Sequence, residues 1–429
     1  MNLYDREEHD VILSKLYSSI ELGTDSIKIV VSEKIKDKFY LLASSSVKSF
    51  GIKKGDVVDT KAVVKCVKDA VLDIESQLGI KLKKVILSVN SKDCIFNIVS
   101  GTIPVQNPEC ITGIDICNVL REAINGKIND DYELVTAVPI SFTVDDKENI
   151  KDPKGVKGNS ISSKIVICEL PKERLYKFLA VIDLCGLETV DIAFSSTGDY
   201  YSVKTKTMDS SVGAIINIGE DSTTVSVYNK GIMIKNKVIN VGSYYVDHDL
   251  SYIYKIDLKT ARELKENFVV ACERYADKHD EIKVISEAGE NQVINQYDAS
   301  KVVEARLVEI LKIAKSEIKA LTNRQISYII VVGGLSELNG FQYLVEKTLG
   351  HTVTVFNNIN IGIRHNKYTS SFGVIKYFDD KLNLRGKVCE MFDTSDIDKL
   401  ISMKNKDENN IIVDRFFGQF LENKEDKVC

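Results

Sequence analysis

The chain has 429 residues, which corresponds to about three domains of ordinary size. Hydrophobic residues make up 44% and charged residues 28%, as in globular proteins with a large core. Lysine and arginine total 57 and aspartate and glutamate total 62, so the net charge is −5. This acidic balance excludes general nucleic-acid binding, because that function needs a basic surface.

The cysteines and histidines show no pattern of a disulfide framework or a metal site. The nine cysteines are an odd number without a Cys-x-x-Cys pair, and the five histidines lack the His-x-x-x-His spacing of zinc sites. Met1–His9 is polar and charged, so we expect no signal peptide. Apolar runs such as Ile329–Val332 are too short to cross a bilayer. We therefore expect reduced thiols in a protein that works inside a cell.

Along the chain, strand-like runs alternate with amphipathic helices, which favours an α/β architecture with mixed sheets. The expected strands include Ile27–Val31, Ala214–Ile218, Val225–Tyr228 and Tyr328–Val332. The expected helices include Lys61–Leu78, Lys172–Leu184, Lys259–Ala276 and Ala299–Leu321. A hairpin around Gly289 is expected at Lys283–Val293, between two helices.

The prolines mark an inserted module. All five lie between residues 104 and 171, which suggests a separate unit at roughly residues 85–165. It opens with the strand-like runs Val85–Val89 and Ile95–Val99 and closes with Lys164–Glu169. Between them, Ile111–Asn125 has the apolar spacing of a helix.

Two loops repeat each other at a constant offset. They are Ile20–Ser26, with the sequence IELGTDS, and Ile216–Ser222, with the sequence INIGEDS. In each, a carboxylate or amide ends one strand, a glycine and polar residues follow, and a second β-branched strand begins. A glycine there lets backbone N–H groups approach an anion. Two such turns facing each other would clamp a polyphosphate; two ordinary hairpins are the alternative.

A third element strengthens the first interpretation. The buried strand Ile329–Val332 runs into Gly333, Gly334, Leu335 and Ser336, and Gly340 begins a helix. Paired glycines at the carboxyl end of a strand make room for a ligand and open a helix N-terminus toward it. The three elements in this order favour a nucleotide-binding cleft.

On these residues the chain resembles the actin-like ATPases, and within them the FtsA family of bacterial cell-division proteins. The resemblance covers nearly the whole chain. It includes further segments, namely Val241–Gly242 with Asp249, Ile150–Pro153, Ala305–Leu311 and Tyr368–Gly373. It implies a two-lobed actin-like (ribonuclease H-like) fold with an inserted FtsA-type α+β subdomain. It also implies a protein that tethers the tubulin-like FtsZ to the cytoplasmic side of the cell membrane at the division site, forms polymers and meets other division proteins.

The resemblance also implies a domain plan. The first lobe is expected at residues 15–84, 162–205 and 362–380, the insertion at 85–161, the second lobe at 206–255 and 325–361, the helical subdomain at 256–324, and a tether with an amphipathic helix at 381–429.

By the same resemblance, a set of residues would bind ATP. These are Gly23, Thr24, Asp25, Ser26, Lys28, Asn217, Gly219, Glu220, Ser222, Thr223, Gly242, Lys265, Gly333, Gly334 and Leu335. Glu21 and Asn217 stand where the family usually has the aspartates that help to hold hydrated Mg²⁺.

Several departures converge on this pocket. Asn217 removes one negative charge, and Glu220 and Asp221 replace the usual pair of glycines. A carboxylate about 5 Å from a phosphate charge costs roughly 3 kcal/mol at an effective dielectric constant near 20. Phe194–Gly198 lacks the expected Gln or Glu and Pro, and Arg262 stands where Glu is usual. We expect weak or absent binding of ATP and Mg²⁺ on a fold kept for assembly. One alternative is a working ATPase in which Asp25, Glu220 or Asp221 replaces the magnesium ligand.

The end of the chain carries a short apolar helix pattern after the polar tether Asp396–Asn410. Its apolar residues are Ile412, Val413, Phe416, Phe417, Phe420 and Leu421. Such a short helix is not stable alone in water, so it needs a membrane surface or a protein groove. Residues 404–427 have five basic and six acidic side chains, so charge does not favour the membrane. The position matches the FtsA targeting helix and favours a membrane anchor; a soluble pilus-assembly-type module whose tail docks on a protein is the other possibility.

The helix Ala299–Leu321 is a candidate partner surface. Its apolar stripe is expected to be buried, and Lys301 and Arg306 lie off that stripe, where they would meet an acidic peptide. A solvated helix face is the simpler alternative. The resemblance implies that this subdomain receives the carboxyl-terminal peptide of FtsZ.

Overall fold

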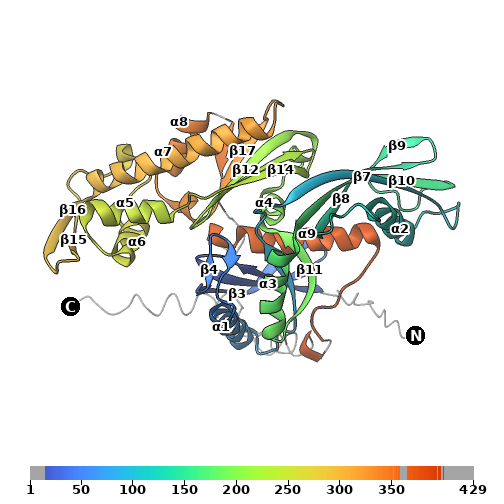
Figure 1. The fold of residues 1–429 in the computed structure, drawn as a ribbon, viewed down its shortest axis with the longest axis horizontal. Coiled ribbons are helices and arrows are strands. Elements are labelled where there is room, and N and C mark those ends of the chain that lie inside the picture. The colour runs from blue at the N-terminus through green and yellow to red at the C-terminus, as the bar shows by residue number, and fades with distance from the viewer. Residues whose placement is uncertain (1–14, 351, 358–364, 394, 398–399, 401–429) are drawn as a thin grey trace, which may run out of the picture.

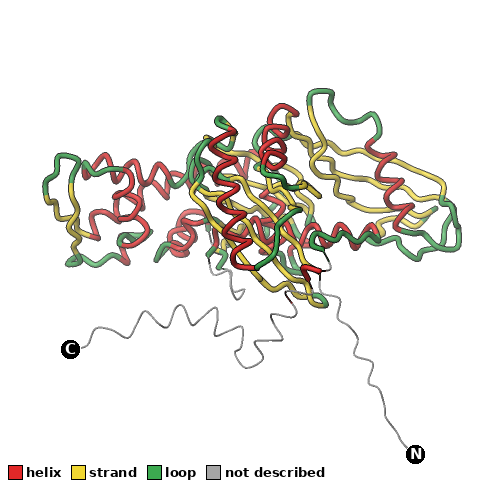
Figure 2. The backbone as a smooth tube through the Cα atoms, turned by 90° about the horizontal axis from the view of Figure 1, so that it is seen from below, coloured by secondary structure: helices red, strands yellow, loops and turns green. Residues whose placement is uncertain are grey.

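The protein has two lobes, each built on a five-stranded mixed sheet (Figure 1). The computed structural model describes residues 15–350, 352–357, 365–393, 395–397 and 400. The lobes lie side by side, with an inserted subdomain extending from the first and a helical subdomain from the second (Figures 1 and 2).

The first lobe has the strand order β11-β6-β1-β2-β3. Its strands are β1 (Lys15–Leu22), β2 (Ser26–Ile35), β3 (Lys38–Lys48), β6 (Lys84–Val89) and β11 (Glu188–Phe194). β1, β2 and β3 pair antiparallel, whereas β6 is parallel to both β1 and β11. α1 (Thr60–Leu78) packs against β2 and β3, and α9 (Thr369–Arg385) packs against β1, β2 and β6. Burial on both faces explains the continuous apolar runs in these strands.

The second lobe repeats this topology with the order β18-β17-β12-β13-β14. Its strands are β12 (Val212–Ile218), β13 (Thr223–Asn229), β14 (Ile232–Ile239), β17 (Tyr328–Val332) and β18 (Val353–Val355). β12 and β13 pair antiparallel and β12 and β17 parallel, as β1, β2 and β6 do in the first lobe. The repeated loops of the sequence are therefore the equivalent β1–β2 and β12–β13 turns, here named loop 1 (residues 23–26) and loop 2 (residues 219–222).

The inserted subdomain is a separate four-stranded antiparallel sheet, β7-β10-β8-β9, with α2 and its own apolar core. Its elements are β7 (Ile95–Pro104), α2 (Gly113–Ile124), β8 (Tyr132–Val144), β9 (Lys147–Ile150) and β10 (Ser160–Pro171). The expected start at residue 85 was wrong, because β6 is a central strand of the first lobe. Its residues Val85, Ile86 and Leu87 are fully buried there. The expected end at residue 161 was also too early, since β10 continues to Pro171.

The helical subdomain caps one end of the second lobe (Figure 1). It contains α5 (Tyr244–Tyr254), α6 (Leu258–Asn267), the hairpin β15 (Glu281–Ile285) and β16 (Asn291–Asn295), and α7 (Gln296–Leu321), with α8 (Phe341–Leu349) packed beside α7. The helix expected at Lys259–Ala276 ends earlier, at Asn267. Beyond it the helix is not continued, because the Val270 amide donates to the Ser300 hydroxyl and the Ala271 amide to the Asn339 carbonyl, and a 3-10 turn follows at Glu273–Tyr275.

Two helices cross where the lobes meet. α4 (Ser195–Val203) lies directly against α9, and glycines allow this close approach. A Cβ atom on Gly373 would stand 1.7 Å from the carbonyl oxygen of Gly198. α9 runs on to Arg385, past the expected boundary at residue 380, and Met391 and Phe392 after it are buried in the first-lobe core. α3 (Lys172–Leu184) and the small hairpin β4 (Ile52–Lys53) and β5 (Asp56–Val57) complete the first lobe.

Candidate functional site

The two repeated loops face each other across one cleft. Each closes with the same hydrogen bond: the Gly23 amide donates to the Ser26 carbonyl at 3.2 Å, and the Gly219 amide to the Ser222 carbonyl at 2.9 Å. A cavity of about 650 Å³ is lined from both lobes, by Asp25 of loop 1 and Glu220 of loop 2 among others. The opposed arrangement expected from the sequence is therefore present.

The predicted nucleotide residues divide into three groups. The large cavity is lined by Asp25, Ser26, Lys28, Asn217, Gly219, Glu220, Lys265, Gly333, Gly334 and Leu335. Gly23, Thr24 and Ser222 line a smaller cavity of about 120 Å³ between the loops. Thr223 and Gly242 line neither cavity; they support loop 2 from behind, and a contact of either with a ligand stays a prediction.

The support behind loop 2 is tight. The fully buried Thr223 hydroxyl donates to the Val241 carbonyl at 2.8 Å. The Ser243 amide donates to the Gly219 carbonyl and the Tyr244 amide to the Glu220 carbonyl. A Cβ atom on Gly242 would stand 2.2 Å from the Glu220 carbonyl oxygen, so only glycine fits there.

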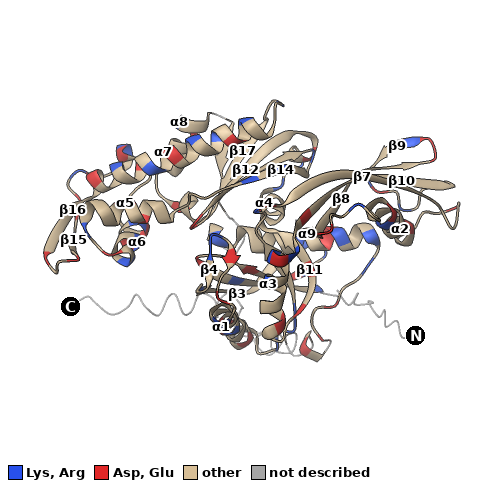
Figure 3. Ribbon diagram, in the orientation of Figure 1, with Lys and Arg blue, Asp and Glu red and all other residues tan. Residues whose placement is uncertain are grey.

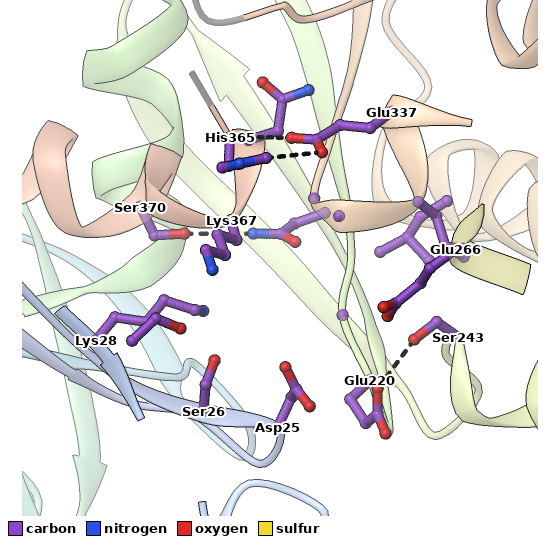
Figure 4. Close-up of a pocket in the computed structure, with 18 of the residues that line it drawn as sticks. Asp25, Ser26, Lys28, Glu220, Ser243, Glu266, Glu337, His365, Lys367 and Ser370 are labelled. Carbon is purple, nitrogen blue, oxygen red and sulfur yellow. Dashed lines mark hydrogen bonds and ion pairs between the residues drawn. The ribbon is translucent and has the colours of Figure 1, made fainter. Parts of the chain in front are cut away.

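The base end of the cleft is the glycine cradle after β17. Gly333 has a φ of +107°, and a Cβ atom on it would stand 2.4 Å from the Ile218 carbonyl oxygen. Gly334 faces open space. Figure 4 shows Glu337 beside His365; its carboxylate accepts from the Asn366 amide at 2.5 Å and lies 3.2 Å from the His365 Nδ1. At this end the backbone of Gly334 is not covered by side chains.

The strand-end residues do not form a metal ligand set. Glu21 lies 3.5 Å from the Lys28 ammonium and accepts from the Ser371 hydroxyl. The Asn217 amide donates to the buried Asp199 carboxylate at 2.8 Å. Within the described ranges, no three His, Cys, Asp or Glu side chains converge as a metal site requires. Glu21 and Asn217 are thus both engaged by other side chains of the protein, and the magnesium-binding role expected for them stays a prediction.

Asp199 was not predicted from the sequence. It lies on α4, 1% exposed, and accepts hydrogen bonds from Asn217 and, at 2.6 Å, from the Ser370 hydroxyl. Burial raises the pKa of Asp199 to about 7, although both hydrogen bonds oppose the shift. The Asp199 carboxylate thus lies behind Asn217, which lines the cavity and contacts Asp199 directly. The one feature of the sequence that could have indicated Asp199 was its acidic side chain directly after Gly198.

Arg262 of α6 occupies the phosphate end between the loops. Its Nη2 lies 2.8 Å from Asp25 Oδ1 and 2.8 Å from Glu220 Oε2, and its Nε lies 3.1 Å from Glu266 Oε1. Burial works to lower the pKa of Arg262, but the charges of Asp25 and Glu220 and the contact with Glu266 outweigh it, and the pKa is raised. The guanidinium is therefore fully charged.

The two carboxylates respond differently to the shared arginine. Burial favours the neutral form of Asp25, but Arg262 and Lys48 together lower its pKa. Glu220 is more buried and lies near Asp25 and Asp247, so burial raises its pKa in spite of Arg262. Lys265 also does not point freely into the cleft, because it forms a 2.6 Å ion pair with Asp247 in which both side chains are nearly inaccessible.

A buried hydroxyl beside the cleft lacks a hydrogen-bond partner among the described residues. The buried Ser26 hydroxyl has no hydrogen-bond partner within the described part of the chain, and Figure 4 shows it at the cavity near Asp25. The cleft thus has a glycine cradle at one end, and Arg262 with its paired carboxylates lines it between the two loops.

The two predicted partner residues lie on different sides of α7. Lys301 lines a shallow groove of about 510 Å³ together with Lys312 and Lys347. Arg306 lies outside it and forms ion pairs with Asp249 at 2.6 Å and with Glu309 at 2.6 Å. Figure 3 shows basic and acidic side chains alternating along this helix.

The predicted terminal anchor, Ile412, Val413, Phe416, Phe417, Phe420 and Leu421, lies outside the described residues. In the part of the chain that the structure describes, no helix has the length and apolar character needed to cross a membrane.

Two family models match the chain. One described as "Cell division protein FtsA" matches residues 214–373, and one described as "SHS2 domain inserted in FTSA" matches residues 94–168. The second match begins just before β7 and leaves β6 outside it, as the sheet topology does.

Curated relatives match over both lobes. The cell division protein FtsA of Bacillus subtilis is 26% identical over 379 residues, covering 87% of this chain and 86% of that protein. FtsA of Escherichia coli K12 is 23% identical over 379 residues, covering 85% of this chain and 90% of that protein.

Solved structures share the fold. A PilM-PilN type IV pilus biogenesis complex matches with a TM-score of 0.57 and 15% identity, covering 84% of this chain and 98% of that one. MreB5 of Spiroplasma citri bound to ADP matches with a TM-score of 0.52 and 12% identity, covering 86% and 97%. These likenesses establish the two-lobed actin-like architecture.

Proposed function

Because the chain belongs to the FtsA family of the actin-like superfamily, we propose that it is a cell-division adaptor that holds FtsZ filaments at the membrane. In this role it would work on the cytoplasmic side of the cell membrane at the division site, assemble into actin-like polymers and contact other division proteins. The observation that carries the proposal is the joint match of the second lobe and the insertion to the two family models.

We further propose that ATP and Mg²⁺ bind this adaptor weakly. Phosphate groups entering between the loops would meet Asp25 and Glu220 and would have to displace both from Arg262. Each displaced carboxylate would then stand near the phosphate charge in a partly buried site, where repulsion is stronger than in water. The open glycine cradle alone contributes base contacts but no charge neutralisation.

Titration of the full-length protein with a fluorescent ATP analogue and Mg²⁺ tests this proposal. We expect no saturation at micromolar nucleotide and no steady phosphate release. Micromolar affinity with turnover would contradict weak binding and favour the alternative ATPase, in which Asp25, Glu220 or Asp221 supplies a magnesium ligand.

The groove beside α7 is the proposed site for an acidic FtsZ peptide. The lining of this groove includes Lys301, Lys312 and Lys347 with Val308, and also the carboxylates of Glu273 and Glu304. Lys347 pairs with Glu304 at 3.2 Å and Lys301 with Asp298 at 3.6 Å, so Lys312 is the cation of the groove that forms no ion pair within the described part of the chain. Arg306 is less suited to this role, because its guanidinium already binds two carboxylates of the chain. Charge reversal at Arg306 would also break its contact between α7 and α5, so it is a poor test of peptide binding.

A charge reversal at Lys301 is the cleaner test. We expect Lys301→Glu to weaken binding of a synthetic FtsZ carboxyl-terminal peptide about tenfold, as one desolvated charge contact would. Lys319→Glu is the matched control, since Lys319 is exposed on the same helix but outside the groove. Equal affinities of the two variants would contradict the site.

We propose that the apolar side chains near the end of the chain attach the protein to the membrane. They are Ile412, Val413, Phe416, Phe417, Phe420 and Leu421. Burial of their large side chains in a lipid surface is favourable by about 1.5–3 kcal/mol for each one fully buried. Co-sedimentation with liposomes, with and without residues 411–429, tests the anchor. Equal pelleting of both forms would contradict it.

A further inference from the structure

We propose that Arg262 is a built-in cation that joins loop 1 to loop 2, in the place where a nucleotide and its metal would join them, and so holds the two lobes together without a ligand. This inference rests on the proposed weak binding of nucleotide. It concerns the coupling of the lobes and not the attachment to FtsZ or membrane.

The contact crosses between the lobes. Arg262 and Glu220 belong to the second lobe and its helical subdomain, whereas Asp25 belongs to the first lobe. One nitrogen of the guanidinium donates to both carboxylates, at 2.8 Å each. A Glu266 carboxylate one helical turn further on α6 accepts from the Arg262 Nε and fixes the direction of the guanidinium. The Ser243 hydroxyl donates to the same Glu220 oxygen, Oε2, at 3.1 Å.

The charges make this contact between the lobes attractive only while the arginine is present. Asp25 and Glu220 both lie within hydrogen-bond distance of the same nitrogen, so without the arginine two carboxylates would face each other across the cleft. Glu220 is 13% exposed and Arg262 25% exposed, so water screens them only in part. With the arginine in place, the same two groups become an attraction between the lobes.

A second contact between the lobes lies beside the first. The Asp221 carboxylate accepts from the Lys54 amide of the β4–β5 turn at 3.0 Å. The next amide of that turn, Gly55, donates to the Thr24 hydroxyl of loop 1 at 3.2 Å. The turn thus touches both loops. Both acidic residues of loop 2 are linked to the first lobe: Glu220 through Arg262, and Asp221 directly. This shared link is one physical reason for the presence of acidic residues at both positions.

Hydrogen exchange of the nucleotide-free full-length protein tests the bridge. Amides in a region held by a contact exchange only when that region opens. We expect Arg262→Gln to raise the exchange rates of residues 23–26, 54–55 and 219–222 about tenfold, as the loss of one partly buried charged contact would. Arg262→Lys, which loses the contact to Glu266, should give a smaller increase.

The matched control is Lys259→Gln on the same helix. Lys259 forms an exposed ion pair with Glu263 at 3.8 Å and does not face the cleft. The Lys259→Gln variant should leave the exchange rates of both loops unchanged. If Arg262→Gln loosens the loops no more than Lys259→Gln does, the bridge is refuted.

A second variant covers the case in which Arg262→Gln unfolds the helical subdomain. Asp25→Asn removes the first-lobe partner without changing α6, and we expect it to raise exchange in the same three segments. If it does not, the inference is overturned. Tight binding of ATP and Mg²⁺ by the wild type would instead contradict the proposed weak binding, while the exchange measured without nucleotide would still decide on the bridge.

Discussion

Loop 1 and loop 2 have the same backbone and different surroundings. Each joins antiparallel strands of equivalent sheets and closes with a glycine-to-serine hydrogen bond. Loop 1 shares the Arg262 contact through Asp25, and its other contacts lie at its rim, such as the Ser49 amide donating to the Asp25 carbonyl and the Gly55 amide to the Thr24 hydroxyl. Loop 2 is held from behind by the turn at Gly242, from the side by Ser243, and across the cleft by Arg262.

This difference shows that the backbone of a turn can suit an anion without determining which group binds there. The backbone sets where N–H groups converge, whereas the side chains decide whether a phosphate or a group of the protein is the partner. In loop 2, both acidic side chains bind groups of the protein: Glu220 binds Arg262 and Ser243, and Asp221 binds the Lys54 amide. Each prediction below compares a residue that holds loop 2 with one elsewhere in the cleft or on loop 1.

The largest effect is expected at the buried ion pair below loop 2. Lys265→Met leaves Asp247, which is 2% exposed, without its cation. Breaking a buried pair in this way costs about 3–5 kcal/mol of the free energy of unfolding. Urea denaturation measures the loss.

The matching change near loop 1 is Lys28→Met. The Lys28–Glu21 pair is longer, at 3.5 Å, and its side chains are 14% and 16% exposed. Glu21 also keeps the hydrogen bond from Ser371. We expect a clearly smaller loss; equal losses would mean that the two loops are supported alike.

The second effect concerns the strand ends before the loops. Glu21 lies 3.5 Å from the Lys28 ammonium, whereas at the equivalent position the Asn217 amide donates to the Asp199 carboxylate. The pKa of Asp199 rises from 3.8 to about 7 on folding because the side chain is buried. The native protein therefore binds more protons than the unfolded chain between these values, so the contribution of Asp199 to stability is full below pH 4 and is lost as the pH rises through 7.

Asp199→Asn should remove this pH dependence. Relative to the variant, the wild type should lose about 1.4 kcal/mol of stability for each pH unit between about pH 4 and pH 7, and the difference should level off above pH 7. Urea denaturation at several pH values measures the difference. Asp183→Asn, at an exposed position of α3, should follow the wild type. Parallel curves for wild type and Asp199→Asn would contradict the raised pKa.

The loops and the glycine cradle were predictable because their signals are local. A strand, a glycine and a second strand lie within seven residues, and Gly333–Gly334 follows β17 directly. Helix and strand positions followed from apolar spacing for the same reason. The boundary at residue 85 was wrong because the apolar run of β6 does not say which sheet it joins.

The contacts made by Arg262 and Asp199 could not be read from the sequence. Arg262 meets Asp25 across 237 residues, and the meeting depends on how α6 is placed on the second lobe. The unusual arginine and the unusual acidic pair were each visible. Their opposite charges were a signal that they belong together, but distance along the chain hid it.

The third effect tests the support behind loop 2. Gly242→Ala would push a methyl group against the Glu220 and Gly219 carbonyl oxygens, which lie 2.2 and 2.5 Å from the position of its Cβ. Such overpacking typically costs about 1–3 kcal/mol, and urea denaturation measures it. Gly334→Ala is the control, since a Cβ atom there meets nothing within 4 Å. A Gly242→Ala variant as stable as this control would show that loop 2 is not pressed against the turn.

The smallest effect is expected at the rim of loop 1. Lys48 and Asp25 form an ion pair of 3.0 Å whose side chains are 53% and 39% exposed. Exposed pairs contribute about 0–1 kcal/mol, and Asp25 keeps Arg262 when Lys48 is replaced. Lys48→Gln should therefore lower the urea midpoint slightly, and the difference should vanish at high salt, because salt screens exposed charges. A loss that persists at 1 M salt would mean that Lys48 holds loop 1 from within the cleft, and loop 1 would then be as firmly built into the protein as loop 2.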